Sequence, residues 1–329
     1  MTDSMENNDV KEAETKEKKN MSESVKGMAK SIGSKANLVV KKSSESLEKS
    51  KEAVFNAVDV NGDGQIDIED VILMAFKVPG VSVKRDNFLR KELKNKYPEE
   101  VIEKAVDQTP MIACIKQKDI DKIADSIIQN EWLKVSGISA ALGAPGGAAM
   151  AATIPADIAQ YYGCLLRVAQ KLLYLYGFQQ IEYKENEQAF DTETMNHIIL
   201  CMGVMFGVAN AKNALLAMAK ALGSGVEKQL VKKALTKGTI YPIVKSISKW
   251  FGVRMTKEVF AGFFKKAIPV VGGVVGGGLT YATFKPCCMK LKNVLEDTYL
   301  SNPDYDKKED IIIDVEDVEE YEETDSDGE

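Results

Sequence analysis

The sequence has few aromatic residues and only one histidine among its 329 residues. Aromatic side chains make up 7% of the chain and apolar side chains 45%, so a core can form, but mainly from small and flexible side chains. Strand-like alternation of apolar and polar residues is scarce. These features argue against a β-rich sandwich and predict an all-α fold.

The five cysteines lack the spacing of a disulfide framework or a zinc site. They are an odd number without a C-x-x-C pair, at Cys114, Cys164, Cys201, Cys287 and Cys288. The N-terminal residues are polar and lack the apolar core of a secretory signal. We therefore expect a cytoplasmic protein, with peripheral attachment to the inner face of the membrane as the alternative.

The net charge of −6 is unevenly distributed. Residues 301–329 are predicted to be an acidic disordered tail, because 304–329 carry 14 acidic side chains against two lysines, a net of −12. Residues 1–303 therefore sum to +6. Such a tail is typically solvated, and the alternatives are that it competes for cations or docks on a basic surface.

Residues 1–50 are predicted to be a disordered basic segment that contains one amphipathic stretch. Apolar residues between Met21 and Val39 recur at helical spacing, among many lysines. A basic amphipathic helix suits an anionic membrane surface or the acidic patch of a membrane-protein partner. A loosely helical tail is the alternative, because Gly27 and Gly33 weaken the helix.

The rest of the chain divides into two predicted helical modules. Residues 51–131 are mainly charged helices separated by turn signals at Pro79-Gly80 and Pro98, whereas 132–300 are rich in Ala, Gly, Leu, Ile and Val. We expect an EF-hand-like module followed by a Gly/Ala-rich helical bundle, for the reasons that follow.

The most specific motif is a twelve-residue loop rich in oxygen ligands, residues 59–70. Ca²⁺ prefers about six to eight oxygens, which such a loop supplies from positions 1, 3, 5, 7, 9 and 12 around a glycine at position 6. Gly64 stands at that sixth position. The predicted ligands are Asp59, Asn61, Asp63, the carbonyl oxygen of Gln65, Asp67 and Asp70.

This loop resembles an EF-hand. Lys51–Val58 and Ile68–Lys77 have the apolar spacing of its entering and exiting helices. Most EF-hands carry Glu where Asp70 stands, and dockerin modules share this Asp. The resemblance implies Ca²⁺ binding, and the shorter carboxylate implies lower affinity or greater tolerance of Mg²⁺.

A degenerate second hand is predicted downstream. The tripeptide Ala-Val-Asp at 57–59 recurs at 105–107, and the four-residue step from Ile66 to an aspartate recurs from Ile115. The loop between these anchors lacks oxygen ligands. We expect the second hand to pair with the first through Ile66 and Ile115 while binding no ion itself, and chance similarity of the short anchors is the alternative.

The second module contains three stretches without charge, Val135–Ala156, His197–Ala211 and Ala267–Phe284. The first is long enough to cross a bilayer at about 20 residues, but Pro145-Gly146-Gly147 and Pro155 are expected to break it. The third has G-x-x-x-G spacing, which lets helices approach closely. A soluble or peripherally attached bundle is favoured, and insertion of one or two hairpins is the alternative.

Several motifs of this module carry a second resemblance. They are Gly143-Ala144-Pro145-Gly146-Gly147, Ile154-Pro155-Ala156-Asp157-Ile158, Leu166-Arg167 with Gln170 and Leu175-Tyr176-Gly177-Phe178, and Ala267–Gly276 followed by Thr283-Phe284. Over roughly 132–300 the chain is similar to the EcsC family. That resemblance implies a bacterial helical protein linked to membrane transporters or the inner face of the envelope, and no catalytic residues carry over from it.

No catalytic constellation is evident. The glycine run at 272–278 lacks the residues of a P-loop or a dinucleotide fingerprint, and His197 is expected to be a packed or capping residue. Nucleophilic triads are unsupported, since no Ser or Cys has an evident basic partner. Asp157 and Arg167, charges that border an apolar region, are either a buried pair or solvent-facing edges.

The sequence therefore predicts a non-enzymatic calcium-binding protein. The ion either opens the helices as in a sensor, exposing Phe55, Met74 and Phe76, or only stabilises the module. Calcium, and a membrane surface or membrane protein, are the expected partners, and no nucleic acid. The alternatives are an enzyme or transporter-accessory protein with a site in the Gly-rich module, and a scaffold with a vestigial ion site. The sequence leaves the oligomeric state open.

Overall fold

A computed structural model describes residues 58–60, 62, 64, 67–142, 149–184, 189–224, 228–255 and 273–302, with the backbone alone for 137–142, 149–158, 228, 252–255 and 273–282. This part of the chain is helical and contains no strand, only a single antiparallel bridge between Lys184 and Ala189. The all-α prediction is confirmed. The helices are α3 (Ile68–Phe76), α4 (Arg85–Leu93), α5 (Glu99–Asp107), α6 (Gln117–Leu142), α7 (Ala149–Leu175), α8 (Thr192–Phe206), α9 (Ala211–Gly223), α10 (Lys228–Thr236), α11 (Tyr241–Met255) and α13 (Gly273–Glu296).

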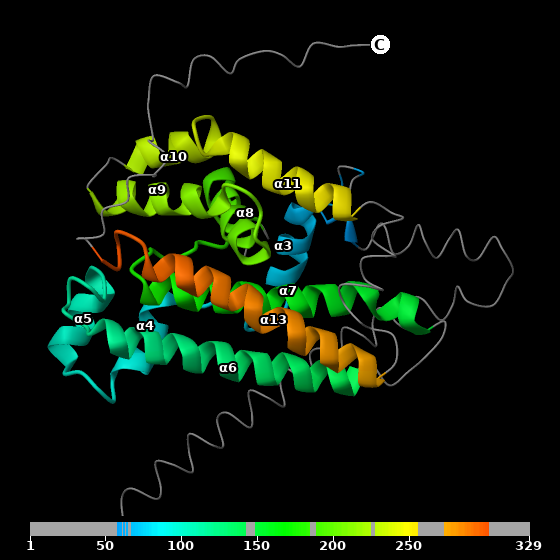
Figure 1. Cartoon of the computed structure of the whole chain (residues 1–329), viewed down its shortest axis with the longest axis horizontal. Helices are drawn as coiled ribbons and strands as arrows, with labels where there is room; N and C mark the ends of the chain where they lie inside the picture. Colours follow the sequence, from blue (N-terminus) through cyan, green and yellow to red (C-terminus); the bar gives the residue numbers. More distant parts are fainter. Residues whose placement is uncertain are drawn as a thin grey trace, which may run out of the picture.

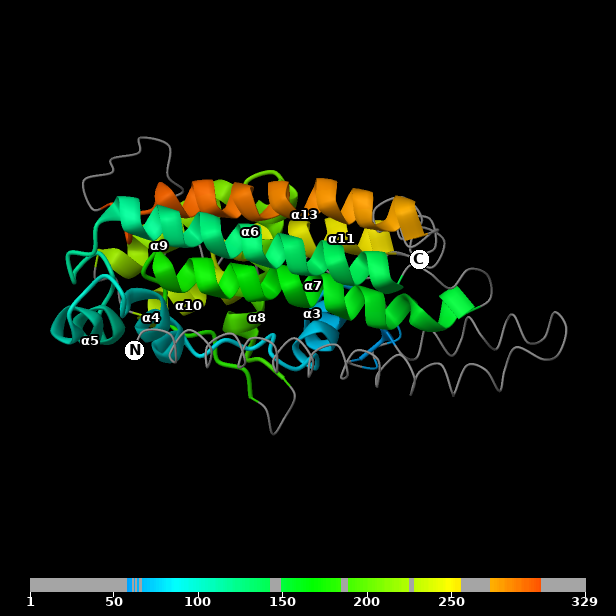
Figure 2. The same cartoon turned by 90° about the horizontal axis from the view of Figure 1, so that it is seen from below.

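Three long helices, α6, α7 and α13, lie side by side along the long axis of the molecule (Figures 1 and 2). The face that α6 and α7 turn toward the core carries Ile128, Leu165 and Leu172, which are buried. Leu165 and Leu172 of α7 are seven residues apart, which places them on one helical face. The three helices form one layer of the fold.

A second layer of shorter helices covers one side of the first. α8 contacts α9, α10, α11 and α13, and α9, α10 and α11 form the upper layer in Figure 1. α8 begins at the side-chain cap of Asp191, which accepts the N–H of Thr194 at 2.8 Å, and ends at Gly207 in the left-handed region, with φ 73°. A glycine suits this helix end because it has no Cβ to clash.

The helix that follows the predicted calcium loop, α3, packs against α7. The approach is close at Gly163 of α7, where an added Cβ would lie 3.5 Å from the carbonyl oxygen of Ala75 in α3 and 2.8 Å from a methyl group of Val81 in the segment after α3. α3 also contacts α8 and α11. The short helices α4 and α5 pack on each other, and α5 lies at one end of the molecule in both views (Figures 1 and 2).

One apolar core runs through both predicted modules, from Val58 to Leu300. The predicted boundary between residues 131 and 132 lies inside α6, which packs on α13 and α7. In the part of the chain that the structure describes, the stretches 51–131 and 132–300 therefore share a core rather than folding around separate ones.

One expectation about local structure needs correction. Pro155, expected to break the chain, lies inside α7, whose turns from Ala159 onward are buried and offset the local cost of a proline. α3 packs on α7 and α5 packs on α4, and the pairing of the two predicted hands through Ile66 and Ile115 stays a prediction. Ile66, the proposed contact to Ile115, lies outside the described residues, as do residues 1–50 and 303–329.

Within the described residues, no helix contains a segment long and apolar enough to cross a membrane. Val135–Ala156 and Ala267–Phe284 extend partly beyond those residues.

Candidate metal site

Asp59 closes the first half of the predicted calcium loop. Its Oδ1 accepts the N–H of Gly62 at 2.8 Å, and its Oδ2 accepts the N–H of Gly64 at 3.0 Å. Both glycines have positive φ, 75° and 81°. Residues with a Cβ are strained in that region, so the two glycines permit the backbone to wrap around the carboxylate of the first loop position.

Asp67 and Asp70 begin α3 with a reciprocal cap. The Oδ1 of Asp67 accepts the N–H groups of Glu69 at 2.7 Å and Asp70 at 3.2 Å, and Oδ2 of Asp70 accepts the N–H of Asp67 at 3.1 Å. This is a capping box, which satisfies N–H groups that a helix start leaves without a partner. The sequence therefore ends the loop and starts the helix with the same two carboxylates.

Asp70 also joins the two ends of the loop. Its Oδ1 accepts the N–H of Val60 at 2.8 Å, ten residues earlier in the chain, and the residue is 0% exposed. A buried carboxylate is costly unless hydrogen-bonded or paired with a cation. These backbone hydrogen bonds link the start of the loop to the start of α3 through the carboxylate of Asp70.

Three of the six predicted ligands, Asn61, Asp63 and Gln65, lie outside the described residues. The other three, Asp59, Asp67 and Asp70, stand at the start and the end of the loop, and Asp67 and Asp70 are directly linked by hydrogen bonds. Among the residues described, no group of three or more His, Cys, Asp or Glu gathers closely enough to hold a metal ion.

A glutamine on α7 anchors the segment that leaves α3. The amide of Gln170 donates to the carbonyl of Val81 at 2.9 Å and accepts the N–H of Val83 at 3.0 Å. Both are contacts between chain positions almost 90 residues apart. The loop, through α3 and this segment, is thus fastened to the central helix of the bundle.

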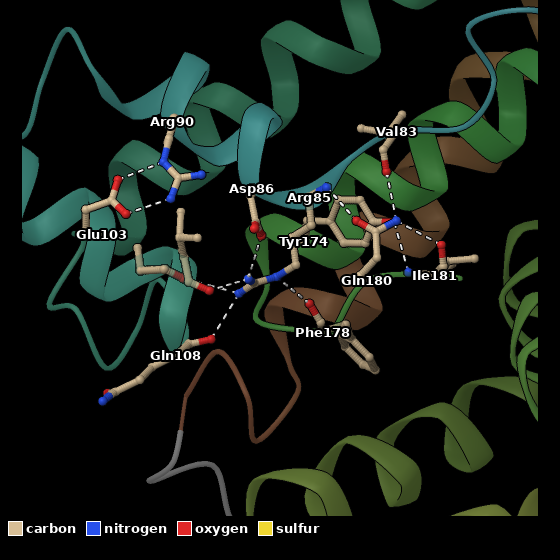
Figure 3. Close-up of polar contacts among 12 residues, drawn as sticks. Val83, Arg85, Asp86, Arg90, Glu103, Gln108, Tyr174, Phe178, Gln180 and Ile181 are labelled. Atoms are coloured by element: carbon tan, nitrogen blue, oxygen red, sulfur yellow. Dashed lines mark hydrogen bonds and ion pairs between the residues drawn. The ribbon is translucent and has the colours of Figure 1, made fainter. Parts of the chain in front are cut away.

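Arg85, at the start of α4, ties three segments together (Figure 3). Its guanidinium donates to the carbonyls of Phe178 at 3.1 Å, Ala105 at 3.2 Å and Gln108 at 3.0 Å, and also to Val106. Burial lowers the pKa of Arg85, but an arginine stays charged in proteins. Three of these carbonyls belong to the end of α5. The last carbonyl groups of a helix have no N–H partner within the helix, and the negative end of the helix dipole attracts a cation such as Arg85.

Arg167, which the sequence singled out, forms an ion pair with the buried carboxylate of Glu131, between α6 and α7. Glu131 is 2% exposed, and its oxygens lie 3.7 Å from Arg167, 3.0 Å from Lys171 and 3.6 Å from Lys134. Burial alone would raise the pKa of Glu131, but the attraction of the three cations outweighs it, and the pKa lies below its ordinary value. Glu131 is therefore ionised at neutral pH.

The sequence left open whether Arg167 belongs to a buried pair with Asp157 or lies at a solvent-facing edge. The structure shows that Arg167 is buried and forms an ion pair with Glu131 on α6. The side chain of Asp157 lies outside the described residues.

His197 on α8 packs against an aromatic ring, as expected. Its ring lies 5.6 Å from that of Phe178, and its Nε2 is buried without a hydrogen-bond partner among the described atoms. Burial lowers the pKa of His197 to about 4. Since the folded pKa lies below the ordinary value of about 6.5, His197 is neutral in the folded protein at neutral pH.

We expect the free energy of unfolding to fall by about 2 kcal/mol between pH 7 and pH 5. The unfolded chain gains a proton on His197 as the pH falls through about 6.5, whereas the folded protein gains it only near pH 4. Urea unfolding at several pH values measures this loss, and His197→Gln should flatten the profile in that window. A wild-type profile that is already flat would contradict the assignment.

The four buried cysteines are poor nucleophiles. Burial raises the pKa of Cys164 to about 11 and that of Cys201 to about 12, and raises those of Cys287 and Cys288 as well. The thiolate is the reactive form, so these thiols are protonated at neutral pH. All five cysteines are free of disulfides, and Cys114 is exposed.

Sequence reasoning missed Arg85, Glu131 and the anchoring role of Gln170. Arg85 and Glu131 occur in charged helical sequence, where nothing distinguishes them from solvated neighbours. Gln170 was noted only as part of a helical motif. Their burial results from contacts between segments far apart in the chain.

No family model, curated protein or solved structure matches the chain.

Proposed function

We propose that residues 59–70 bind Ca²⁺ in an EF-hand-type loop, and that the ion stabilises the helical bundle on which the loop is anchored. The observation that carries this proposal is the buried carboxylate of Asp70, the twelfth loop position, which joins Val60 and Asp67 across the loop. A cation at this site offsets the cost of burying that charge. The two glycines of positive φ support the same turn.

The proposed ligands are those that an EF-hand supplies. Asp59, Asp67 and Asp70 provide carboxylate oxygens, and Asn61, Asp63 and the carbonyl of Gln65 complete the set. Mg²⁺ is the competing ion, because Asp70 is shorter than the usual Glu and reaches a large ion less readily with both oxygens. Ca²⁺ and Mg²⁺ should therefore compete for the same loop.

A stabilising role suits the packing of α3 better than a sensor role. Met74 and Phe76, two residues that a sensor would expose, are both 5% exposed. The Phe76 ring lies 4.7 Å from that of Phe190 and 5.2 Å from that of Tyr183, and Gln170 fastens the segment after α3 to α7. Opening α3 would break these contacts. Phe55 lies outside the described residues.

The remaining parts of the proposal rest on sequence alone. The EcsC resemblance of residues 132–300 supports a non-enzymatic helical module at the inner face of a membrane, with a membrane surface or membrane protein as partner. The basic residues before position 50 support attachment to anionic lipid.

We expect calorimetric titration of the full-length protein with CaCl₂ to give one site per chain. Asp59→Ala should abolish the binding heat, because it removes the first carboxylate ligand and the acceptor of Gly62 and Gly64. Asp107→Ala is the matched control, because Asp107 is an exposed aspartate at the corresponding position of the second loop. Its titration should match that of the wild type.

The proposal fails if wild-type protein gives no calcium heat, or if Asp59→Ala binds as tightly as Asp107→Ala. A hydrophobic dye in the same titration separates the two roles of the ion. A stabilising ion leaves dye fluorescence unchanged, whereas a sensor raises it through exposed apolar surface.

A further inference from the structure

The layer formed by α9, α10 and α11 carries charge of almost one sign. Between Ala211 and Met255 the chain has nine Lys and Arg residues, and Glu227 is the single acidic residue. α10 and α11 follow one another along the upper edge of the molecule in Figure 1. Like charges brought together on a folded surface repel one another, which favours an anionic partner.

The apolar residues of these helices face the core and leave the lysines outside. Val231, Leu235 and Ile247 are buried, as the spacing of an amphipathic helix requires. The lysines at 232, 233, 237, 245 and 249 are exposed. We call this set of five the basic face.

Few acidic side chains in the described part of the chain lie close enough to pair with the lysines of the basic face. Lys232 lies 3.6 Å from Glu193, and Lys245 lies over the ring of Tyr241 at 5.4 Å. In the part of the chain described, Lys233, Lys237 and Lys249 have no ion pair. Half-buried Ile243 and Trp250 lie on the same helix as Lys245 and Lys249 and add apolar surface.

The C-terminal residues leave the fold beside this layer. Tyr299 and Leu300 pack against Gly223, the last residue of α9, where any added side chain would meet the Tyr299 ring. α10 begins five residues after Gly223, at Lys228. The chain from residue 303 onward is therefore tethered at the α9–α10 corner.

The segment 303–329 has the charge and the reach to cover the basic face. It is 27 residues long, with 14 acidic side chains against Lys307 and Lys308, a net of −12. A flexible chain of this length spans about 30 Å on average, which is comparable to the length of about 20 residues of helix. Apolar residues, Ile311–Ile313 and Val315, lie among its acids.

We infer that the acidic segment 303–329 docks on the basic face of its own chain. The carboxylates neutralise the lysines of α10 and α11, and the isoleucines of the segment contact the apolar surface near Ile243 and Trp250. The tether at Leu300 raises the effective concentration of the segment at this face. A docked segment also competes with any other anionic partner for the same lysines. This inference uses none of the calcium-loop residues and stands independently of the proposed function.

Zero-length carbodiimide cross-linking of the full-length protein tests the docking, because the reagent joins carboxylates to lysines only when they touch. Peptide mapping should find acids of 304–329 linked to the basic face several-fold more often than to Lys91 and Lys94. Both control lysines are exposed and lie in or just after α4. High salt should remove the preference, because it screens exposed charges within a few ångströms.

A triple variant, Lys232→Glu with Lys233→Glu and Lys237→Glu, should reduce the links to the two remaining lysines of the basic face, Lys245 and Lys249, and enlarge the hydrodynamic radius. Lys91→Glu with Lys94→Glu is the control and should change neither. Links spread evenly over all exposed lysines would overturn the inference. A different occupant of the basic face would also overturn it. In that case the full-length chain would show no such links and would bind phosphatidylserine vesicles as tightly as a chain truncated after residue 302.

Discussion

Replacing Arg85 with methionine is expected to lower the free energy of unfolding by about 3–5 kcal/mol. Methionine keeps the volume of the side chain but supplies no donor. The carbonyls of Phe178, Ala105, Val106 and Gln108 then lose their partner in a buried site (Figure 3). Urea unfolding followed by circular dichroism measures the loss.

Arg90→Met is the matched control, because Arg90 lies on the same helix. Its guanidinium pairs with Glu103 at 2.6 Å, but both side chains are about 40% exposed, so water replaces the interaction. The midpoint of unfolding should barely change. If Arg85→Met were no more destabilising than Arg90→Met, Arg85 would not be holding the end of α5.

Glu131→Gln is expected to cost a similar amount, about 3–5 kcal/mol at neutral pH. The neutral amide leaves Arg167, Lys171 and Lys134 around a site without its anion. Because the folded pKa of Glu131 is depressed, its contribution is full above the ordinary glutamate pKa of about 4.3. The contribution is lost as the pH falls through the lower folded value.

The pH profile distinguishes this role from simple packing. The difference in stability between wild type and Glu131→Gln should be constant near neutral pH and shrink below about pH 4. Glu100→Gln, at an exposed position in the first turn of α5, should follow the wild type throughout. A Glu131→Gln protein as stable as Glu100→Gln at pH 7 would contradict the ion-pair account.

Local signals predicted the fold class and several helix ends. The loop motif placed a helix over Ile68–Lys77, and α3 spans Ile68–Phe76, because Asp67 caps it through an interaction that is local in sequence. Pro98 was predicted to separate two helices and caps the start of α5. Such features depend on neighbouring residues and are therefore visible in the sequence.

Contacts between distant segments were not predictable in the same way. Arg167 was singled out as either a member of a buried pair or a solvent-facing edge, and its partner, Glu131, lies 36 positions away on another helix. The packing of α3 on α7 was likewise not predicted from the sequence. Short repeats specify local structure, whereas the partner of a helix depends on how all apolar faces fit together.

At the candidate metal site, too, features that depend on neighbouring residues were predictable, and those that depend on distant segments were not. The capping box of Asp67 and Asp70 follows from their spacing. The burial of Asp70 does not, because it depends on the tertiary arrangement around the start of α3, including the return of the chain to Val60 ten residues earlier. Sequence therefore identified the loop, and the structure adds the reason why an ion in this loop should affect the stability of the bundle.

The most direct test of this account is the thermal midpoint of the full-length protein in saturating CaCl₂ and in chelator. At about one hundred times its dissociation constant, an ion that binds only the folded state adds about 2.7 kcal/mol, which raises the midpoint by several degrees for a chain of this size. We predict this rise for the wild type and for Asp107→Ala, and no rise for Asp59→Ala. Equal midpoints with and without calcium in the wild type, or an undiminished rise in Asp59→Ala, would contradict a stabilising calcium site in this loop.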